Sequence, residues 1–280
     1  MHQSSPKTPN YELWTELFNP TNTEHFIGNT EIVESVVKWA EAWNKGHKQK
    51  PLLLWGQSGS GKTCLATLIA KLNGWDLFEL NASDFRSKEI IEKLAGAAAM
   101  NASFSGNKRL VLFDEVDGLQ SQDRGGAGAI TQLLKESQNP VILTANDIYG
   151  DQKLAPIRGS CTVLEFKKIN YLSMAKRLRE ILTEQKIAFD EEAVKELAKN
   201  SMGDFRAALL DLQTLAIEGS ITKENVASLG YRERQEKIFT VMKQVFSGSS
   251  YKEIRKSIFS SDLSNDMIFF QLETKSLNMT

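Results

Sequence analysis

The chain has 280 residues, 41% of them hydrophobic and 25% charged, which is typical of a globular protein with one large domain and one or two small ones. Its net charge of −1 shows no overall basic excess, so a contact with nucleic acid would need a local basic surface. The polar N-terminus, the short apolar runs and the two distant cysteines, Cys64 and Cys161, exclude a signal peptide, a membrane span and a disulfide framework, and indicate a cytoplasmic protein.

In the first 167 residues, short apolar runs alternate with helical patterns. The segment up to Gly28 is expected to be a loop, and apolar residues at helical spacing from Ile32 to Trp43 predict a helix that ends near Gly46. Such alternation is typical of an α/β fold with a parallel sheet covered on both faces. The predicted strands are 52–55, 76–80, 110–113, 141–144 and 162–166, and the further predicted helices are 62–72, 87–99 and 127–137.

After Lys167 the pattern changes, and no further strand is predicted. Helices are predicted at 171–185, 190–199, 204–218 and 223–229, with Asp190 as an N-cap. The sequence therefore predicts an α/β domain over 1–167, an all-helical domain over 168–229 and a further helical region over 230–280.

A glycine-rich turn between the first predicted strand and the next helix fits the pattern G-x-x-x-x-G-K-[ST]. Glycines let backbone N–H groups turn inward around phosphates, and the N-terminus of the following helix adds positive potential. Lys62 can then reach the β- and γ-phosphates, and the Thr63 hydroxyl can bind Mg²⁺. The predicted nucleotide-binding residues are Gly56, Gln57, Ser58, Gly59, Ser60, Gly61, Lys62 and Thr63.

The apolar strand over 110–113 ends in two carboxylates. Asp114 is expected to hold Mg²⁺, directly or through water, and Glu115 to polarise the attacking water. Asp117 is expected to be a turn residue. A GTPase is rejected, because residues 144–147 lack the lysine and the spacing of the Asn-Lys-x-Asp sequence that recognises guanine.

In this order the motifs resemble the AAA+ family, and specifically the large subunit of archaeal replication factor C, over residues 11–230. The resemblance implies an α/β AAA+ P-loop ATPase domain with a five-stranded parallel sheet over 1–167. A small helical lid domain over 168–229 and the start of a helical collar over 230–280 would follow. The segments that carry the resemblance are 39–43, 79–84, 113–118, 123–126 and 143–147.

The resemblance implies roles for two further residues. Asn146 is expected to be sensor 1, which orients the lytic water with an amide that both donates and accepts hydrogen bonds. Arg206, in the motif at 203–206, is expected to be sensor 2 and to reach from the lid to the γ-phosphate, coupling nucleotide state to the angle between domains. Lys62, Glu115, Asn146 and Arg206 are thus the predicted catalytic residues of a Mg-ATP hydrolase.

Two departures from the family pattern are informative. Small clamp-loader subunits carry Ser-Arg-Cys, whose arginine reaches the neighbouring ATP site, whereas Ser160 occupies that position here and Arg158 precedes it by two residues. The resemblance therefore implies a subunit that receives an arginine and donates none. The chain also ends at Thr280, before a complete collar, as a truncation, a split gene product or a short variant would.

The resemblance implies that ATP binding and hydrolysis, with Mg²⁺, drive loading of the PCNA sliding clamp onto primer–template DNA, in a hetero-oligomer with replication factor C small subunits. Arg86, Lys88 and Arg124 are candidate contacts to the DNA backbone. One alternative is an initiator or branch-migration ATPase, which would need a terminal DNA-binding module that the helices after Tyr231 do not indicate. Another is a nucleotide-binding regulatory partner that loads no clamp, against which Glu115 argues.

Overall fold

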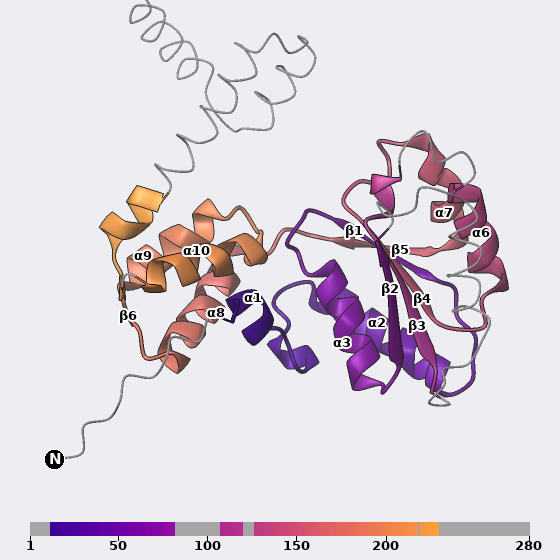
Figure 1. Ribbon diagram of the computed structural model, residues 1–280, viewed down its shortest axis with the longest axis horizontal. Coiled ribbons are helices and arrows are strands. Elements are labelled where there is room, and N and C mark those ends of the chain that lie inside the picture. Colours follow the sequence, from indigo (N-terminus) through magenta and orange to yellow (C-terminus); the bar gives the residue numbers. More distant parts are fainter. Residues whose placement is uncertain (1–11, 82–106, 120–125, 218, 230–280) are drawn as a thin grey trace, which may run out of the picture.

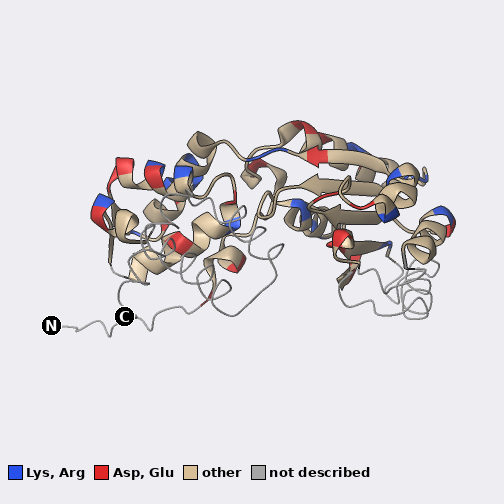
Figure 2. Ribbon diagram, turned by 90° about the horizontal axis from the view of Figure 1, so that it is seen from above, with Lys and Arg blue, Asp and Glu red and all other residues tan. Residues whose placement is uncertain are grey.

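The computed structural model describes residues 12–81, 107–119, 126–217 and 219–229. Within them an α/β part lies beside a helical part (Figure 1). Basic and acidic residues are interspersed over both parts (Figure 2), as the near-neutral net charge predicts. None of the helices in these ranges has the length and apolar character needed to cross a membrane.

The α/β part is built on a parallel sheet with the strand order β2-β3-β4-β1-β5. Each strand begins and ends within one residue of its predicted bounds. The central strands β3, β4 and β1 are runs of mostly buried apolar side chains, whereas β2 and β5, at the two edges of the sheet, are only partly buried. The α/β fold and the five-stranded sheet are therefore confirmed. The strands are β1 (Leu52–Gly56), β2 (Asp76–Asn81), β3 (Arg109–Asp114), β4 (Val141–Ala145) and β5 (Thr162–Phe166).

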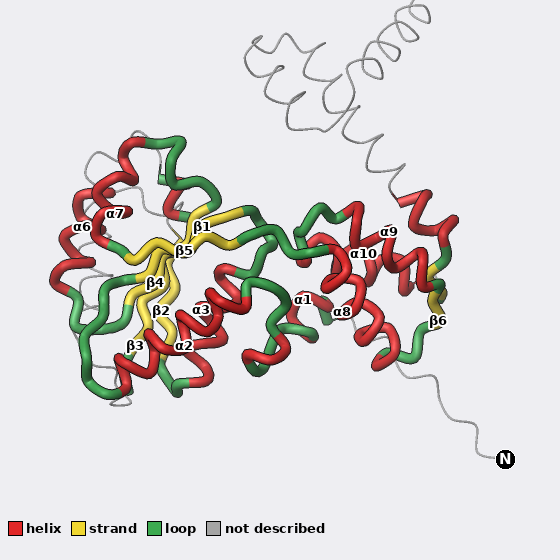
Figure 3. The backbone as a smooth tube through the Cα atoms, turned by 180° about the vertical axis from the view of Figure 1, so that it is seen from behind, coloured by secondary structure: helices red, strands yellow, loops and turns green. Residues whose placement is uncertain are grey.

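Helices cover both faces of the sheet (Figure 3). Since successive strand side chains point to opposite faces, Leu53 and Val111 pack with α6 and α7, whereas Leu54 and Leu112 pack with α2 and α3. The predicted helix over 87–99 lies outside the described residues. The covering helices are α2 (Thr30–Asn44), α3 (Lys62–Leu72), α6 (Gly126–Glu136) and α7 (Ala155–Ser160), and a 3-10 turn, η5 (Gln152–Leu154), precedes α7.

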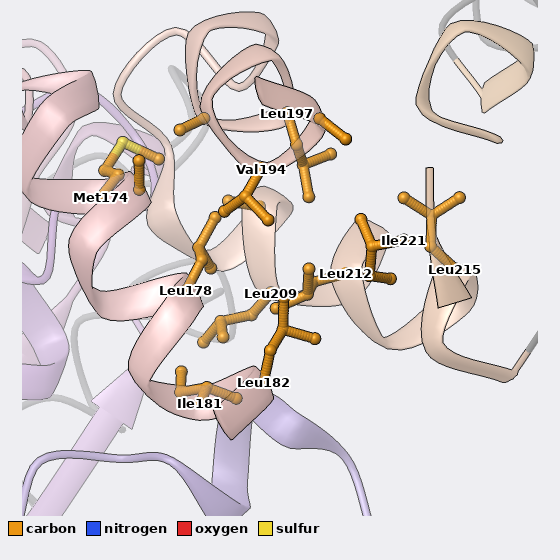
Figure 4. Close-up of a cluster of buried hydrophobic side chains, with 14 of the residues drawn as sticks. Met174, Leu178, Ile181, Leu182, Val194, Leu197, Leu209, Leu212, Leu215 and Ile221 are labelled. Atoms are coloured by element: carbon orange, nitrogen blue, oxygen red, sulfur yellow. The ribbon is translucent and has the colours of Figure 1, made fainter. Parts of the chain in front are cut away.

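The helical part has its own apolar cluster, to which Leu178, Val194 and Leu212 belong (Figure 4). The carboxylate of Asp190 accepts a hydrogen bond from the backbone N–H of Glu192 (2.9 Å), which confirms the predicted N-cap. The helices are α8 (Tyr171–Glu184), α9 (Glu191–Asn200) and α10 (Phe205–Ile217), followed by a helical stretch over 223–229.

Two sequence predictions are wrong. The helical part contains a pair of parallel strands, β6 (Ala188–Phe189) and β7 (Ser220–Ile221), which are too short to give a strand pattern. The N-terminal segment is not a loop throughout, since it forms α1 (Trp14–Leu17) and the 3-10 turn η1 (Thr23–His25).

Helix α1 packs with the helical part rather than with the sheet (Figure 1). The Trp14 side chain is buried in the helical cluster, and its backbone N–H donates to Oε1 of Gln213 (3.0 Å). The division of the chain at residues 167 and 229 stays a prediction, and the proposed collar over 230–280 lies outside the described residues.

Candidate nucleotide-binding site

The loop between β1 and α3 is closely surrounded, and two of its glycines adopt left-handed backbone conformations. A Cβ atom added to Gly59 (φ +66°) would lie 1.7 Å from Oδ1 of Asp204. One added to Gly61 (φ +101°) would lie 2.6 Å from Cζ of Phe26. The loop therefore requires glycine at both positions, for backbone angle and for space.

Lys62, at the first turn of α3, is only 7% exposed. Its ammonium donates hydrogen bonds to the carbonyl oxygens of Gly56 (2.8 Å) and Gln57 (3.0 Å) and to Oδ1 of Asn146 (3.0 Å). Burial lowers the pKa of Lys62, and nearby carboxylates, chiefly Asp117, oppose that effect. Lys62 thus joins the loop to the end of β4.

The predicted metal ligands, Thr63 and Asp114, are in direct contact. The Thr63 hydroxyl donates to Oδ1 of Asp114 (2.7 Å), and the Thr144 hydroxyl donates to the same oxygen. The next residue, Glu115, has a left-handed backbone (φ +55°), and its N–H donates to the Thr144 hydroxyl (3.0 Å). A hydroxyl beside a carboxylate supplies the hard oxygen ligands that Mg²⁺ takes.

The carboxyl ends of the strands, the loop and the start of α10 line one pocket of about 460 Å³. Gly56 and Gln57 contribute through their carbonyl contacts to Lys62. The structure thus brings the predicted binding, metal and catalytic residues together. The predicted residues that line the pocket are Ser58, Gly59, Ser60, Gly61, Lys62, Thr63, Asp114, Glu115, Asn146 and Arg206.

The helical part closes one side of this pocket. The backbone N–H of Phe205 donates to the carbonyl of Gly59 (3.2 Å), and Nε2 of Gln57 donates to the carbonyl of Met202 (3.5 Å). Arg206, one residue into α10, lies on the pocket wall. These contacts bring Arg206 close to the phosphate-binding loop, although Arg206 follows Gly59 of that loop by 147 residues in the sequence.

Two further acids at the site were not predicted. Glu79 of β2 lines the pocket, and its pKa is raised by burial and by the neighbouring charge of Asp114. Asp117 lies in the 3-10 turn η4 (Val116–Gly118), and its Oδ2 accepts hydrogen bonds from the N–H groups of Asn146 (3.0 Å) and Asp147 (3.3 Å). Sequence spacing carries no signal for either acid, because their partners are about 30 residues away.

Arg158 and Ser160 are engaged within their own chain. The Arg158 guanidinium donates to the carbonyl of Ile148 (2.7 Å) and lies 4.7 Å from the ring centroid of Tyr149. The Ser160 hydroxyl donates to the carbonyl of Pro156 (2.9 Å). The candidate DNA contacts Arg86, Lys88 and Arg124 lie outside the described residues.

Comparisons with known proteins concern the family of the chain. The family model described as "ATPase family associated with various cellular activities (AAA)" matches residues 52–161. The replication factor C large subunit of Methanococcus maripaludis (strain C7) is 40% identical over 241 residues, which cover 86% of this chain and 50% of the relative. That of Natronomonas pharaonis is 37% identical over 263 residues, 94% of this chain and 53% of the relative.

The chain thus spans about half the length of these curated relatives. Among solved structures, the RuvB Holliday junction branch migration motor of Thermotoga maritima shares the fold, with a TM-score of 0.62 at 18% identity over 86% of this chain and 85% of that one. At that identity the likeness concerns the fold alone. The chain is therefore a homologue of replication factor C large subunits and carries a domain of the AAA ATPase family.

Proposed function

We propose that this chain is the ATP-hydrolysing part of a replication factor C large subunit, which acts with small subunits to load a sliding clamp onto primer–template DNA. The observation that carries the proposal is the convergence of the glycine-rich loop, two strand-end acids, Asn146 and Arg206 on one pocket. The identity of 37–40% to large subunits favours a loader over the branch-migration alternative, which has only the fold likeness in its favour.

The residues present suit a magnesium-bound triphosphate. The ammonium of Lys62 and the N–H groups of the loop would bind phosphate oxygens, and Thr63 with Asp114 would hold the metal. Bound Mg²⁺ would neutralise charge on the phosphates.

Three further side chains would act on the attacking water and the phosphates. Glu115, on the pocket wall, would orient the water and take up its proton. Asn146 uses Oδ1 to accept from Lys62, which leaves its amide N–H groups to hold that water. Arg206 would contact the γ-phosphate from the helical part.

The contacts of Arg158 and Ser160 support a subunit that donates no arginine to a neighbour. The resemblance also implies that this pocket receives an arginine from a neighbouring subunit. Since the isolated chain lacks that arginine, we expect it to hydrolyse ATP slowly. Turnover should rise strongly when a small subunit supplies an arginine to this pocket, since a trans arginine contributes about 10³-fold or more in related phosphoryl transfers.

The proposal is tested by ATP turnover of the chain assembled with small subunits, with and without clamp and primed DNA. Lys62→Ala should reduce turnover by about a hundredfold or more, because it removes a donor to the phosphates. Lys71→Ala, on the exposed last turn of the same helix, is the matched control and should leave turnover unchanged. Turnover that ignores both clamp and primed DNA would reject loading, while leaving ATP hydrolysis in place.

A further inference from the structure

Strands β3 and β4 are held together by backbone hydrogen bonds within the sheet and by side-chain hydrogen bonds at the edge of the pocket. Their backbone pairing ends at Phe113 and Leu143. Beyond that point the two strand ends are joined by side chains. Thr144 bonds to Asp114 and Glu115, and Asp117 bonds to the backbone beyond β4. These bonds, rather than the sheet, hold the two strand ends together where they face the pocket.

Asn146 depends on this arrangement because it lies just outside the sheet. The pairing of β4 with β1 ends at Ala145, opposite Trp55. The backbone N–H of Asn146 is bound instead by Oδ2 of Asp117, which also accepts from the N–H of Asp147. Hydrogen bonds to an ionised carboxylate are about twice as strong as neutral ones, so this pair fixes the backbone from which the Asn146 side chain extends.

The chain's own geometry makes Asp117 suited to this task. The left-handed backbone of Glu115 (φ +55°) turns the chain sharply after β3. Val116 is then fully buried, and the 3-10 turn places Asp117 beside the end of β4. Asn146 in turn accepts a hydrogen bond from Lys62, which extends the connection to the phosphate-binding loop.

We infer that Asp117 is a positioning residue for ATP hydrolysis, which holds the Asn146 amide in place through its backbone. The inference rests on the proposed function, since it assigns Asp117 a part in the same reaction. It distinguishes Asp117 from Asp114 and Glu115, because those two acids line the pocket, whereas Asp117 does not and accepts hydrogen bonds from the protein backbone.

The first test needs no nucleotide: amide hydrogen exchange of the peptide that contains Asn146 and Asp147. Asp117→Ala should accelerate exchange at these two amides by about tenfold or more, because they lose a charged acceptor. Asp117→Asn keeps one acceptor oxygen and should retain most of the protection. Asp151→Ala is the control. Asp151 lies in the segment that follows β4, as Asn146 and Asp147 do, but its carboxylate accepts from the backbone N–H of Lys153. Unchanged exchange in Asp117→Ala, or equal acceleration in Asp151→Ala, would overturn the inference.

The second test measures ATP turnover in the assembled complex. Asp117→Ala should lower kcat by about tenfold and shift KM for ATP less than about threefold, whereas Asp117→Asn should stay within about threefold of the parent. In an Asn146→Ala background, Asp117→Ala should cause no further loss, because the side chain that it positions is gone. Independent, multiplicative losses, or an Asp117→Asn variant as slow as Asp117→Ala, would contradict a positioning role.

The two failures are distinguishable. If the unmodified complex hydrolyses no ATP, the proposed function fails, and with it any role of Asp117 in that reaction. If it hydrolyses ATP and Asp117→Ala is equally fast, the inference alone fails. Melting temperatures of the variants, with Asp117→Asn as the conservative change, separate a loss of positioning from a loss of folding.

Discussion

Gly59 and Gly74 have nearly the same backbone angle, φ +66° and +64°, in different surroundings. A Cβ at Gly74 would meet nothing within 4 Å, so Gly74→Ala should cost only the left-handed penalty of about 1–2 kcal/mol. Gly59→Ala should cost more and weaken ATP binding, because it displaces Asp204, whose Oδ1 accepts from the N–H of Ala207 at the start of α10. Urea unfolding and ATP titration measure both effects, and equal losses in the two variants would contradict the close packing at Gly59.

Two thiols, that of the half-buried Cys64 and that of the buried Cys161, make the free energy of unfolding depend on pH in the alkaline range. Burial raises the pKa of Cys64 to about 11 and that of Cys161 to about 12, from 9.0. Above pH 9 the unfolded chain ionises its thiols while the native chain keeps them protonated, so their stabilisation is complete below pH 9 and is lost as pH rises. Each thiol should cost about 2 kcal/mol by pH 11.

This loss is measured as the free energy of unfolding in urea between pH 8 and pH 11. The double variant Cys64→Ala/Cys161→Ala lacks both thiols and should show a smaller fall over this range, whatever its stability at pH 8. A fall as large as that of the unmodified chain would mean that other groups cause it.

At this scale the sequence predicts residues whose chemistry lies within one local motif. The loop from Gly56 to Thr63 and the acid pair after Phe113 are predictable, because spacing along the chain fixes their contacts. Asn146 and Arg206 needed the family resemblance, since no local pattern distinguishes them from surface residues. Asp117 is a turn residue, as the sequence predicts, but its hydrogen bonds are not predictable, because the amides that it binds follow a different strand.

Among the elements, α1 has four residues and is held by tertiary contacts. Trp14 is 7% exposed in the cluster of the helical part, whereas its neighbour Leu13 is 48% exposed. Trp14→Ala should destabilise the helical part by about 3 kcal/mol or more, because it leaves a cavity in that cluster. Leu13→Ala should cost about 0.5 kcal/mol or less. Urea unfolding followed by circular dichroism compares the two, and a small effect of Trp14→Ala would contradict the packing of α1.

The elements that the sequence missed share one property: tertiary contacts stabilise them. Helix α1 depends on Trp14 and on the hydrogen bonds of Gln213, and β6 and β7 contribute two residues each. The short helix α7 was also missed, because a six-residue segment is too short to give a periodic pattern. Long elements such as α3 were predicted to the residue, since their apolar pattern spans several turns.

At the scale of the whole molecule, the contact of the helical part with the phosphate-binding loop places Arg206 on the wall of the pocket. If Arg206 reaches the γ-phosphate, Arg206→Ala should weaken ATP binding about ten- to a hundredfold and reduce the rise in melting temperature that ATP causes. Arg177→Ala removes an arginine that pairs with Glu180 and Glu184 on α8, and should leave the ATP-induced rise unchanged. Equal behaviour of the two variants would exclude a role for Arg206 at the nucleotide.

The most direct measurement is a crystal structure of the chain with Mg²⁺ and a non-hydrolysable ATP analogue. The account predicts phosphate oxygens against Lys62 and the backbone N–H groups of the loop, with the metal beside Thr63 and Asp114. A nucleotide seated elsewhere, for example in the cavity lined by Trp43 and Lys50 at the opposite ends of the strands, would contradict it. So would a nucleotide in the pocket whose metal has no contact with Thr63 or Asp114.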